Sequence, residues 1–146
     1  MNLRQATMSD AAFLLACRAD PGTQAASWSR EPIIPSKHLA WVAETLDNPS
    51  RVLLIADECN GGPPVGTVRL DRRAGTAAEV SITIAPGERG KGYAQPMLSL
   101  AALQARALGI TKLMATVRGD NRASLKAFIG AGYAITADRV EMELSL

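Results

Sequence analysis

A glycine-rich basic turn separates an apolar strand pattern from a long helical pattern. The strand pattern ends at Ile84, the turn reads Arg89-Gly90-Lys91-Gly92-Tyr93-Ala94, and the helical pattern continues to Ala107. The first turn of a helix presents backbone N–H groups without internal partners at the positive end of the helix dipole. The glycines let a ligand approach the backbone closely, and Arg89 and Lys91 add positive charge. This turn therefore predicts a phosphate-binding site.

The spacing of the turn excludes two common phosphate loops. A Walker A loop needs Ser or Thr after its Gly-Lys pair, whereas Lys91 is followed by Gly92. A dinucleotide-binding loop needs a third glycine three residues after the second, and Gln95 occupies that position.

Length and composition are typical of one globular domain over 1–146. The chain has 146 residues, of which 47% are hydrophobic and 21% charged. No apolar run approaches the ~18 residues of a membrane span, and the first residues lack the apolar segment of a secretory signal. Cys17 and Cys59 form no metal or redox motif, so we expect reduced thiols, no metal site and a cytoplasmic protein. The net charge of +2 is too small to indicate a nucleic-acid partner.

The hydrophobic pattern predicts the element order β-α-α-β-β-β-α-β-α-β-β. The expected strands are 3–6, 51–56, 65–70, 79–84, 112–117, 133–136 and 140–146. The first helix would be capped by Ser9 or Asp10 and end at Asp20-Pro21-Gly22. The other expected helices are 36–46, 94–107 and 121–129. This order suits a mixed α/β (α+β) fold, with a mainly antiparallel sheet and one parallel pair where the helix 94–107 crosses over.

Two motifs resemble the GNAT superfamily of acetyl-CoA-dependent N-acetyltransferases. The family signature Arg/Gln-x-x-Gly-x-Gly/Ala follows a central strand and is matched by Arg89, Gly92 and Ala94. The run from Asn121 to Tyr133 resembles the family block Asn-x-x-Ser-x-x-x-Tyr/Phe-x-x-x-Gly-Phe/Tyr. The resemblance spans nearly the whole chain. It implies the GNAT fold, a central sheet flanked by helices in a single domain, and acetyl-CoA as the acyl donor.

The resemblance also implies how this donor binds. Strand 79–84 would splay from strand 112–117, and pantetheine would pair with backbone groups of Ile82 and Ile84 like an added strand. An N–H near Ile84 would face the thioester oxygen, and the pyrophosphate would bind the turn from Arg89 to Ala94. Asn121 and Ser124 would contact the cofactor, although capping of the last helix explains Asn121 almost as well.

Two positions bear on acid–base chemistry. Glu79 opens the central strand, where many family members carry a glutamate that takes the proton of the amine. An exposed position at a strand end explains Glu79 equally well. Phe128 would border the cofactor where many relatives have a Tyr that protonates the leaving thiolate, and Phe has no proton to give. Tyr133 matches a position that is usually a packed aromatic. The loss is tolerable because thiols have pKa values of roughly 8.5 and leave readily.

The first half of the chain resembles a subgroup that acetylates amino-sugar nucleotides in bacterial surface-glycan synthesis, of the pseudaminic acid pathway type. This weaker likeness implies that Arg30, His38 and Trp41 border the acceptor through phosphate pairing and stacking. His38 and Trp41 share one helical face, where simple packing is the alternative. Cys17 departs from the subgroup, which often has an aromatic there.

The prediction is an N-acetyltransferase, monomer or homodimer, acting on the primary amine of a small molecule such as a nucleotide-linked amino sugar. One alternative is N-terminal protein acetylation of the ribosomal-protein type. Another is a non-catalytic acyl-CoA-binding module, which the missing Tyr at Phe128 favours.

Overall fold

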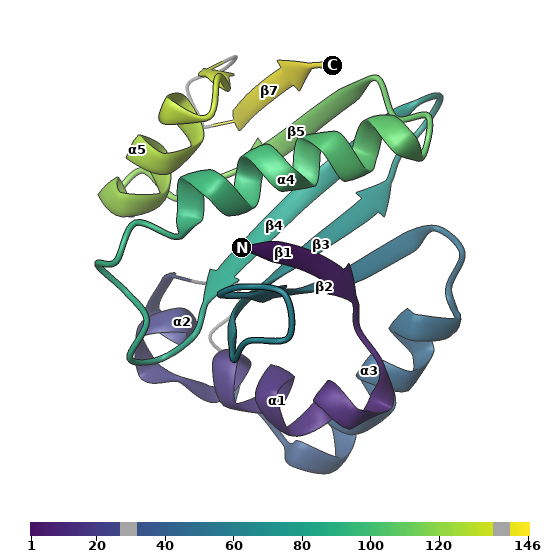
Figure 1. Cartoon of the computed structure of the whole chain (residues 1–146), viewed down its shortest axis with the longest axis vertical. Helices are drawn as coiled ribbons and strands as arrows, with labels where there is room; N and C mark the ends of the chain where they lie inside the picture. The colour runs from purple at the N-terminus through teal and green to yellow at the C-terminus, as the bar shows by residue number, and fades with distance from the viewer. Residues whose placement is uncertain (27–31, 136–140) are drawn as a thin grey trace.

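A seven-stranded sheet with the strand order β1-β2-β3-β4-β5-β7-β6 forms the centre of the protein (Figure 1). The computed structural model describes residues 1–26, 32–135 and 141–146. The strands are β1 (Asn2–Gln5), β2 (Arg51–Asp57), β3 (Pro64–Arg72), β4 (Ala77–Ile84), β5 (Lys112–Thr116), β6 (Ala134–Ile135) and β7 (Glu141–Ser145). The helices are the 3-10 turn η1 (Met8–Asp10), α1 (Ala11–Ala19), α2 (Pro21–Ala26), α3 (Pro35–Asp47), α4 (Ala94–Ala107) and α5 (Arg122–Gly130). Within the described residues only β4 and β5 pair in parallel, so the predicted mixed, mainly antiparallel fold class is confirmed.

Helices cover both faces of the sheet, because successive side chains of a strand point to opposite faces. On one face, α4 and α5 pack on the larger core, which includes Leu54, Leu70 and Val80. On the other face, α1 and α3 pack on a smaller core around Leu53 and Ile55. Figure 1 shows α4 crossing the sheet on one side, with α1 and α3 grouped together away from it. Of the candidate site residues described below, those of the pocket lie on the α1 and α3 face, and the glycine-rich loop follows the end of β4.

The start of the first helical region differs from the prediction. Asp10 precedes α1 as expected, but its side chain does not cap that helix. Its carboxylate instead accepts hydrogen bonds from the backbone N–H of Thr7 and from the Arg4 guanidinium, each at 2.9 Å. Arg4 also donates to Asp57 of β2, at 2.9 Å. Asp10 therefore joins the start of α1 to the first two strands.

The end of this helical region also differs, because Pro21–Ala26 forms the short helix α2 where only a helix stop was predicted. The reason is local. Asp20 is extended after the end of α1, and its carboxylate accepts a hydrogen bond from the backbone N–H of Thr23 at 3.1 Å. An Asp cap followed by Pro, whose φ suits the first helical position, starts a new helix.

Strands β4 and β5 separate partway along β4. Their parallel pairing joins Ala77–Glu79 to Lys112–Met114 and ends there. Beyond this point β4 stays paired with β3 as far as Ile84, and β5 stays paired with β7 as far as Thr116. The facing edges of β4 and β5 therefore have backbone N–H and C=O groups available to another extended chain.

Candidate active site

The loop between β4 and α4 has the geometry of an anion site. Gly90 and Gly92 have φ values of 77° and 81°, a region that glycine adopts readily and other residues avoid. A Cβ at either glycine would meet no atom within 4 Å, so this side of the loop is open. Helix α4 begins directly afterwards at Ala94, and Pro96 in its first turn removes only a donor that the helix does not need. The loop therefore fits a pyrophosphate held by backbone N–H groups.

The charged side chains of this loop are already paired. Lys91 Nζ lies 2.9 Å from Glu88 Oε2, and the hydrogen bond to Glu88 raises the pKa of Lys91. The Tyr93 hydroxyl donates to Glu58 in the loop after β2, at 3.1 Å. Arg89 donates to Asp20, at 2.6 Å. Contacts of these side chains with a pyrophosphate remain predictions.

Ile82 and Ile84 of β4 have side chains packed against the larger core. Their backbone lies on the part of β4 that no longer pairs with β5. Asn121 caps α5, since its Oδ1 accepts a hydrogen bond from the Ser124 N–H at 3.2 Å. The capping function is thus confirmed, and cofactor contact by either residue remains a prediction.

Phe128 and Tyr133 form a buried aromatic pair, each 3% exposed. Their rings meet edge to face, with 4.9 Å between the centroids. Among the described residues, the Tyr133 hydroxyl has no hydrogen-bond partner, and burial raises the pKa of Tyr133. Phe128 has no hydroxyl, so this residue cannot protonate the leaving thiolate.

Glu79 is the last residue of β4 that pairs with β5. Its neighbours are Asp71 of β3 on one side and Met114 of β5 on the other. Its Oε2 accepts a hydrogen bond from Arg73 at 2.7 Å, and about one third of its side chain is exposed. Glu79 shares a face of β4 with Ser81, which lines the pocket described next. Alternate residues of a strand are spaced by about 7 Å. The carboxylate therefore lies beside the pocket and outside its wall.

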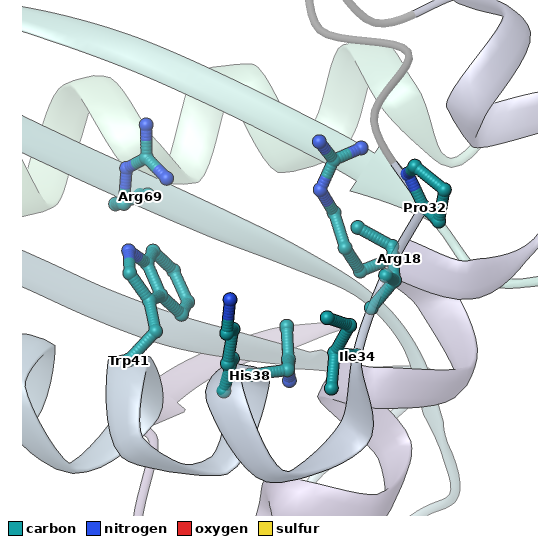
Figure 2. Close-up of a pocket in the computed structure, with 8 residues that line it drawn as sticks. Arg18, Pro32, Ile34, His38, Trp41 and Arg69 are labelled. Atoms are coloured by element: carbon teal, nitrogen blue, oxygen red, sulfur yellow. The ribbon is translucent and has the colours of Figure 1, made fainter.

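A pocket opens on the sheet face that α1 and α3 cover (Figure 2). Its outer part has a volume of about 570 Å³ and is lined by Arg18, Pro32, Ile33, Ile34, Lys37, His38, Trp41 and Arg69. A smaller cavity of about 90 Å³ shares Arg18, His38, Trp41 and Arg69 with it. This inner cavity reaches Ser81 and Thr83 on β4. The pocket thus leads from solvent to the strand that borders the β4/β5 gap.

Aromatic and basic side chains face one another in this pocket. The His38 and Trp41 rings lie 5.6 Å apart, and the Arg69 guanidinium lies 5.5 Å from the centroid of the Trp41 ring. Figure 2 shows the guanidinium groups of Arg18 and Arg69 on either side of the pocket, with His38 between them along α3. Burial and the nearby charge of Arg18 lower the pKa of His38, so its imidazole is neutral at pH 7. His38 and Trp41 thus lie together in one pocket, and their contact with an acceptor remains a prediction.

The charged side chains in the described lining of the pocket are cations, and one of them, Arg69, is paired with Asp71 at 3.1 Å. The described lining includes Arg18, Lys37 and Arg69 and contains no Asp or Glu. Sequence reasoning missed these three cations. The sequence does distinguish Arg69, because it is a charged residue within a mostly apolar strand pattern. Arg30, predicted at this site, lies outside the described residues.

Two further features concern metals and membranes. Within residues 1–26, 32–135 and 141–146, no group of three or more His, Cys, Asp or Glu side chains could hold a metal ion. Over the same residues, no helix is both long and apolar enough to span a bilayer.

Comparison with known proteins identifies the family. A family model described as the acetyltransferase (GNAT) domain matches residues 1–134. A Bacillus subtilis (strain 168) protein named "Putative phosphinothricin acetyltransferase YwnH" is 35% identical over 109 residues, which cover 71% of this chain and 65% of the relative. This alignment therefore spans slightly less than two thirds of the relative's length.

Solved structures share the fold over nearly the whole chain. A crystal structure described as "a putative phosphinothricin N-acetyltransferase" is 27% identical, with a TM-score of 0.81 and coverage of 99% of this chain and 98% of the other. Spermidine N-acetyltransferase from Vibrio cholerae, in complex with CoA and spermine, has a TM-score of 0.86 at 18% identity, covering 99% and 94%. Since the family model spans most of the sequence, the chain belongs to the GNAT family of acetyl-CoA-dependent N-acetyltransferases.

Proposed function

We propose that this protein transfers an acetyl group from acetyl-CoA to the primary amine of a small acceptor that also carries a negative charge. The observation that supports this acceptor class is the positive pocket beside β4, with Arg18, Lys37 and Arg69 in its lining. A charged group that leaves water needs a partner of opposite sign. A carboxylate, phosphinate or phosphate meets this requirement here, and a polyamine does not.

Two acceptors of this class have separate support. The likeness of the first half of the chain to sugar-nucleotide enzymes favours a nucleotide-linked amino sugar, whose base or sugar would lie against Trp41. Phosphinothricin is a smaller amino acid with a carboxylate and a phosphinate, and the names of two similar proteins support an acceptor of that kind. The position of Arg69 favours the smaller acceptor, because its guanidinium already covers one face of the Trp41 ring.

Acetyl-CoA supplies the activated acyl group as a thioester. The chain must bind the thioester oxygen, bind the pyrophosphate and take the proton of the amine. The unpaired edge of β4 near Ile84 is the proposed place for the N–H that binds the thioester oxygen. The loop from Arg89 to Ala94 is the proposed pyrophosphate site.

The remaining task is to take the proton of the amine, since alkylamines are mostly protonated near pH 7. Glu79 is the proposed base, acting through a chain of waters because its carboxylate lies outside the pocket wall and five residues before Ile84, about 17 Å along the strand. His38 is a second candidate, because its neutral imidazole lines the pocket itself.

The test is to measure CoA release from acetyl-CoA with phosphinothricin, a uridine-diphosphate-linked amino sugar, spermidine and a short peptide. We expect kcat/KM for an anionic amine to exceed that for spermidine by at least about tenfold, since placing like charges together costs several kcal/mol. Preference for spermidine or the peptide would refute the anionic acceptor. Binding of acetyl-CoA without turnover of any amine would favour the acyl-CoA-binding module.

A further inference from the structure

An ion pair joins the proposed pyrophosphate loop to helix α2. Arg89 Nη2 lies 2.6 Å from Asp20 Oδ2 and also donates to the Thr23 hydroxyl at 2.9 Å. The same Asp20 oxygen accepts the Thr23 N–H that starts α2, at 3.1 Å. One carboxylate therefore both initiates α2 and holds the first residue of the loop.

Gly22 shows how closely the guanidinium lies against α2. A Cβ placed on Gly22 would lie 2.5 Å from Arg89 Nη1 and 3.2 Å from its Cζ. Gly22 has a helical conformation and is not among the glycines with positive φ. Its backbone therefore does not require glycine, and a Cβ at this position would displace the Arg89 guanidinium.

The other end of α2 is bonded to the loop after β5. Arg118 Nη1 donates to the Ala25 carbonyl at 3.2 Å, and Arg118 also pairs with Asp120 at 2.9 Å. This loop leads to Asn121, the cap of α5. Helix α2 is thus bonded to both loops that follow the separating strands β4 and β5, and Figure 1 shows it beside the end of β4.

Helix α2 also adjoins the acceptor pocket. It follows α1 directly, and Cys17 and Arg18 in the last turn of α1 line the inner cavity. A movement of the Arg89 loop would therefore reach the wall of the acceptor pocket through Asp20, two residues after Arg18.

We propose that Arg89 is a positioning residue, which holds the pyrophosphate loop against α2 through Asp20 and so couples cofactor binding to the end of α1 at the acceptor pocket. This inference rests on the proposed pyrophosphate loop. In this arrangement the Arg89 guanidinium stays bound to Asp20, and the backbone N–H groups of the loop face the cofactor. The alternative is that the guanidinium leaves Asp20 and binds the pyrophosphate itself.

Calorimetric titration with CoA separates the two roles. If Arg89 positions the loop, Asp20→Asn and Arg89→Ala each weaken CoA binding by roughly two- to fivefold, the range of an exposed ion pair. The double variant then binds no more weakly than either single variant, because both remove the same pair. If Arg89 binds the pyrophosphate, Asp20→Asn leaves CoA affinity unchanged or raises it while Arg89→Ala lowers it, which would overturn the proposal. Additive losses in the double variant would overturn it as well.

Hydrogen exchange measured by mass spectrometry tests the coupling itself. In the unaltered protein, CoA should slow amide exchange in both 85–94 and 20–26. In Gly22→Ala, whose new Cβ displaces the guanidinium while Ala suits a helix better than Gly, CoA should protect 85–94 and no longer 20–26. Glu88→Gln, which removes the other ion pair of the loop, is the matched control and should keep both effects.

The failures of the two proposals are distinguishable. Protection of 20–26 that persists in Gly22→Ala, or that is absent from the unaltered protein while 85–94 is protected, would overturn the coupling alone. Absence of protection in 85–94 would refute the pyrophosphate loop and the coupling with it.

Discussion

Glu79 and Asp71 lie directly opposite each other on β4 and β3, and each carboxylate is bound by an arginine. Arg73 donates to Glu79 at 2.7 Å, and Arg69 donates to Asp71 at 3.1 Å. Like charges at directly opposed positions of a sheet repel, and each arginine offsets this repulsion by pairing with one of the two carboxylates. Glu79 and Ser81 lie on the same face of β4, and Ser81 forms part of the pocket wall.

The first prediction concerns Glu79 as the base. Glu79→Gln should lower kcat by on the order of a hundredfold, because an amide cannot accept the proton. CoA affinity should stay within about twofold, since the pyrophosphate loop is at the other end of β4. Steady-state rates from pH 6 to 9 provide the measurement, and the defect should shrink as pH rises and the amine loses its proton to solvent. A rate near that of the unaltered protein at every pH would leave Glu79 as an exposed residue at a strand end.

The second prediction concerns His38 and pH. Burial and Arg18 lower the pKa of His38 in the folded protein below its ordinary value of 6.5. The unfolded chain therefore binds a proton that the folded protein does not, and stability falls as pH drops below about 6.5. His38→Gln should flatten this part of the stability curve, measured by urea unfolding between pH 5 and 8. An unchanged slope would mean that His38 titrates alike in both states.

The same variant tests His38 as the base. If His38 takes the proton, His38→Gln should lower kcat while the loss in Glu79→Gln stays small. If Glu79 does so, the two variants should show the reverse order of effects. If both variants keep the kcat of the unaltered protein, water takes the proton.

The fold and the glycine-rich turn from Arg89 to Ala94 could be predicted from the sequence because their signals are local. The apolar strand pattern, the glycines at 90 and 92 and the helical pattern after them all lie within one short segment. The bounds of most elements consequently match to within one or two residues. Helix α2 was missed because Asp-Pro-Gly both ends one helix and can start another, and only the Asp20 contacts decide between them.

The acceptor pocket was harder to predict, because its cations come from three separate elements. Arg18 lies on α1, Lys37 on α3 and Arg69 on β3, and no local pattern brings them together. His38 and Trp41 were found because both lie on one helical face. The register that sets Arg69 beside Ser81 is a tertiary property, so the positive charge of the pocket emerges only from the folded sheet.

The third prediction separates acceptor binding from packing at Trp41. For a nucleotide-linked acceptor, Trp41→Ala should raise the KM roughly fivefold or more, because a base stacked on an aromatic contributes about 1 to 3 kcal/mol. The Kd for CoA should not change, since no residue of the loop from Arg89 to Ala94 lines the pocket that contains Trp41. Leu46 packs against the same smaller core, so Leu46→Ala is a control for lost packing without a lost ring in the pocket. A large drop in melting temperature with no selective effect on the acceptor would make Trp41 a core residue.

The fourth prediction tests the pyrophosphate loop. Gly92→Glu places a side chain and a negative charge where the loop is open, and should weaken CoA binding at least several-fold. Gly75→Glu is the matched control, because Gly75 has a similar φ of 69° in the turn before β4 and also has no atom within 4 Å of a Cβ. Calorimetry should show a loss of affinity in Gly92→Glu alone. Equal losses in both variants would indicate general backbone strain.

The last prediction concerns the unpaired hydroxyl of Tyr133. This group is buried and has no hydrogen-bond partner in the described part of the chain, and a buried polar group left unsatisfied costs about 1 to 3 kcal/mol. Tyr133→Phe removes the hydroxyl and keeps the edge-to-face contact with Phe128, so unfolding should require about 1 kcal/mol more. For a chain of this length, that gain raises the melting temperature by roughly 2 to 4 °C.

The rate of acetyl transfer in the same variant tests whether Tyr133 is the proton donor, because Phe128 has no hydroxyl and the Tyr133 ring packs against it. An unchanged kcat would mean that CoA leaves as a thiolate without a tyrosine acid, as the low pKa of a thiol allows. A stable variant with a tenfold lower kcat would instead make the Tyr133 hydroxyl the proton donor, and the absence of a partner would then be explained by its use in the reaction.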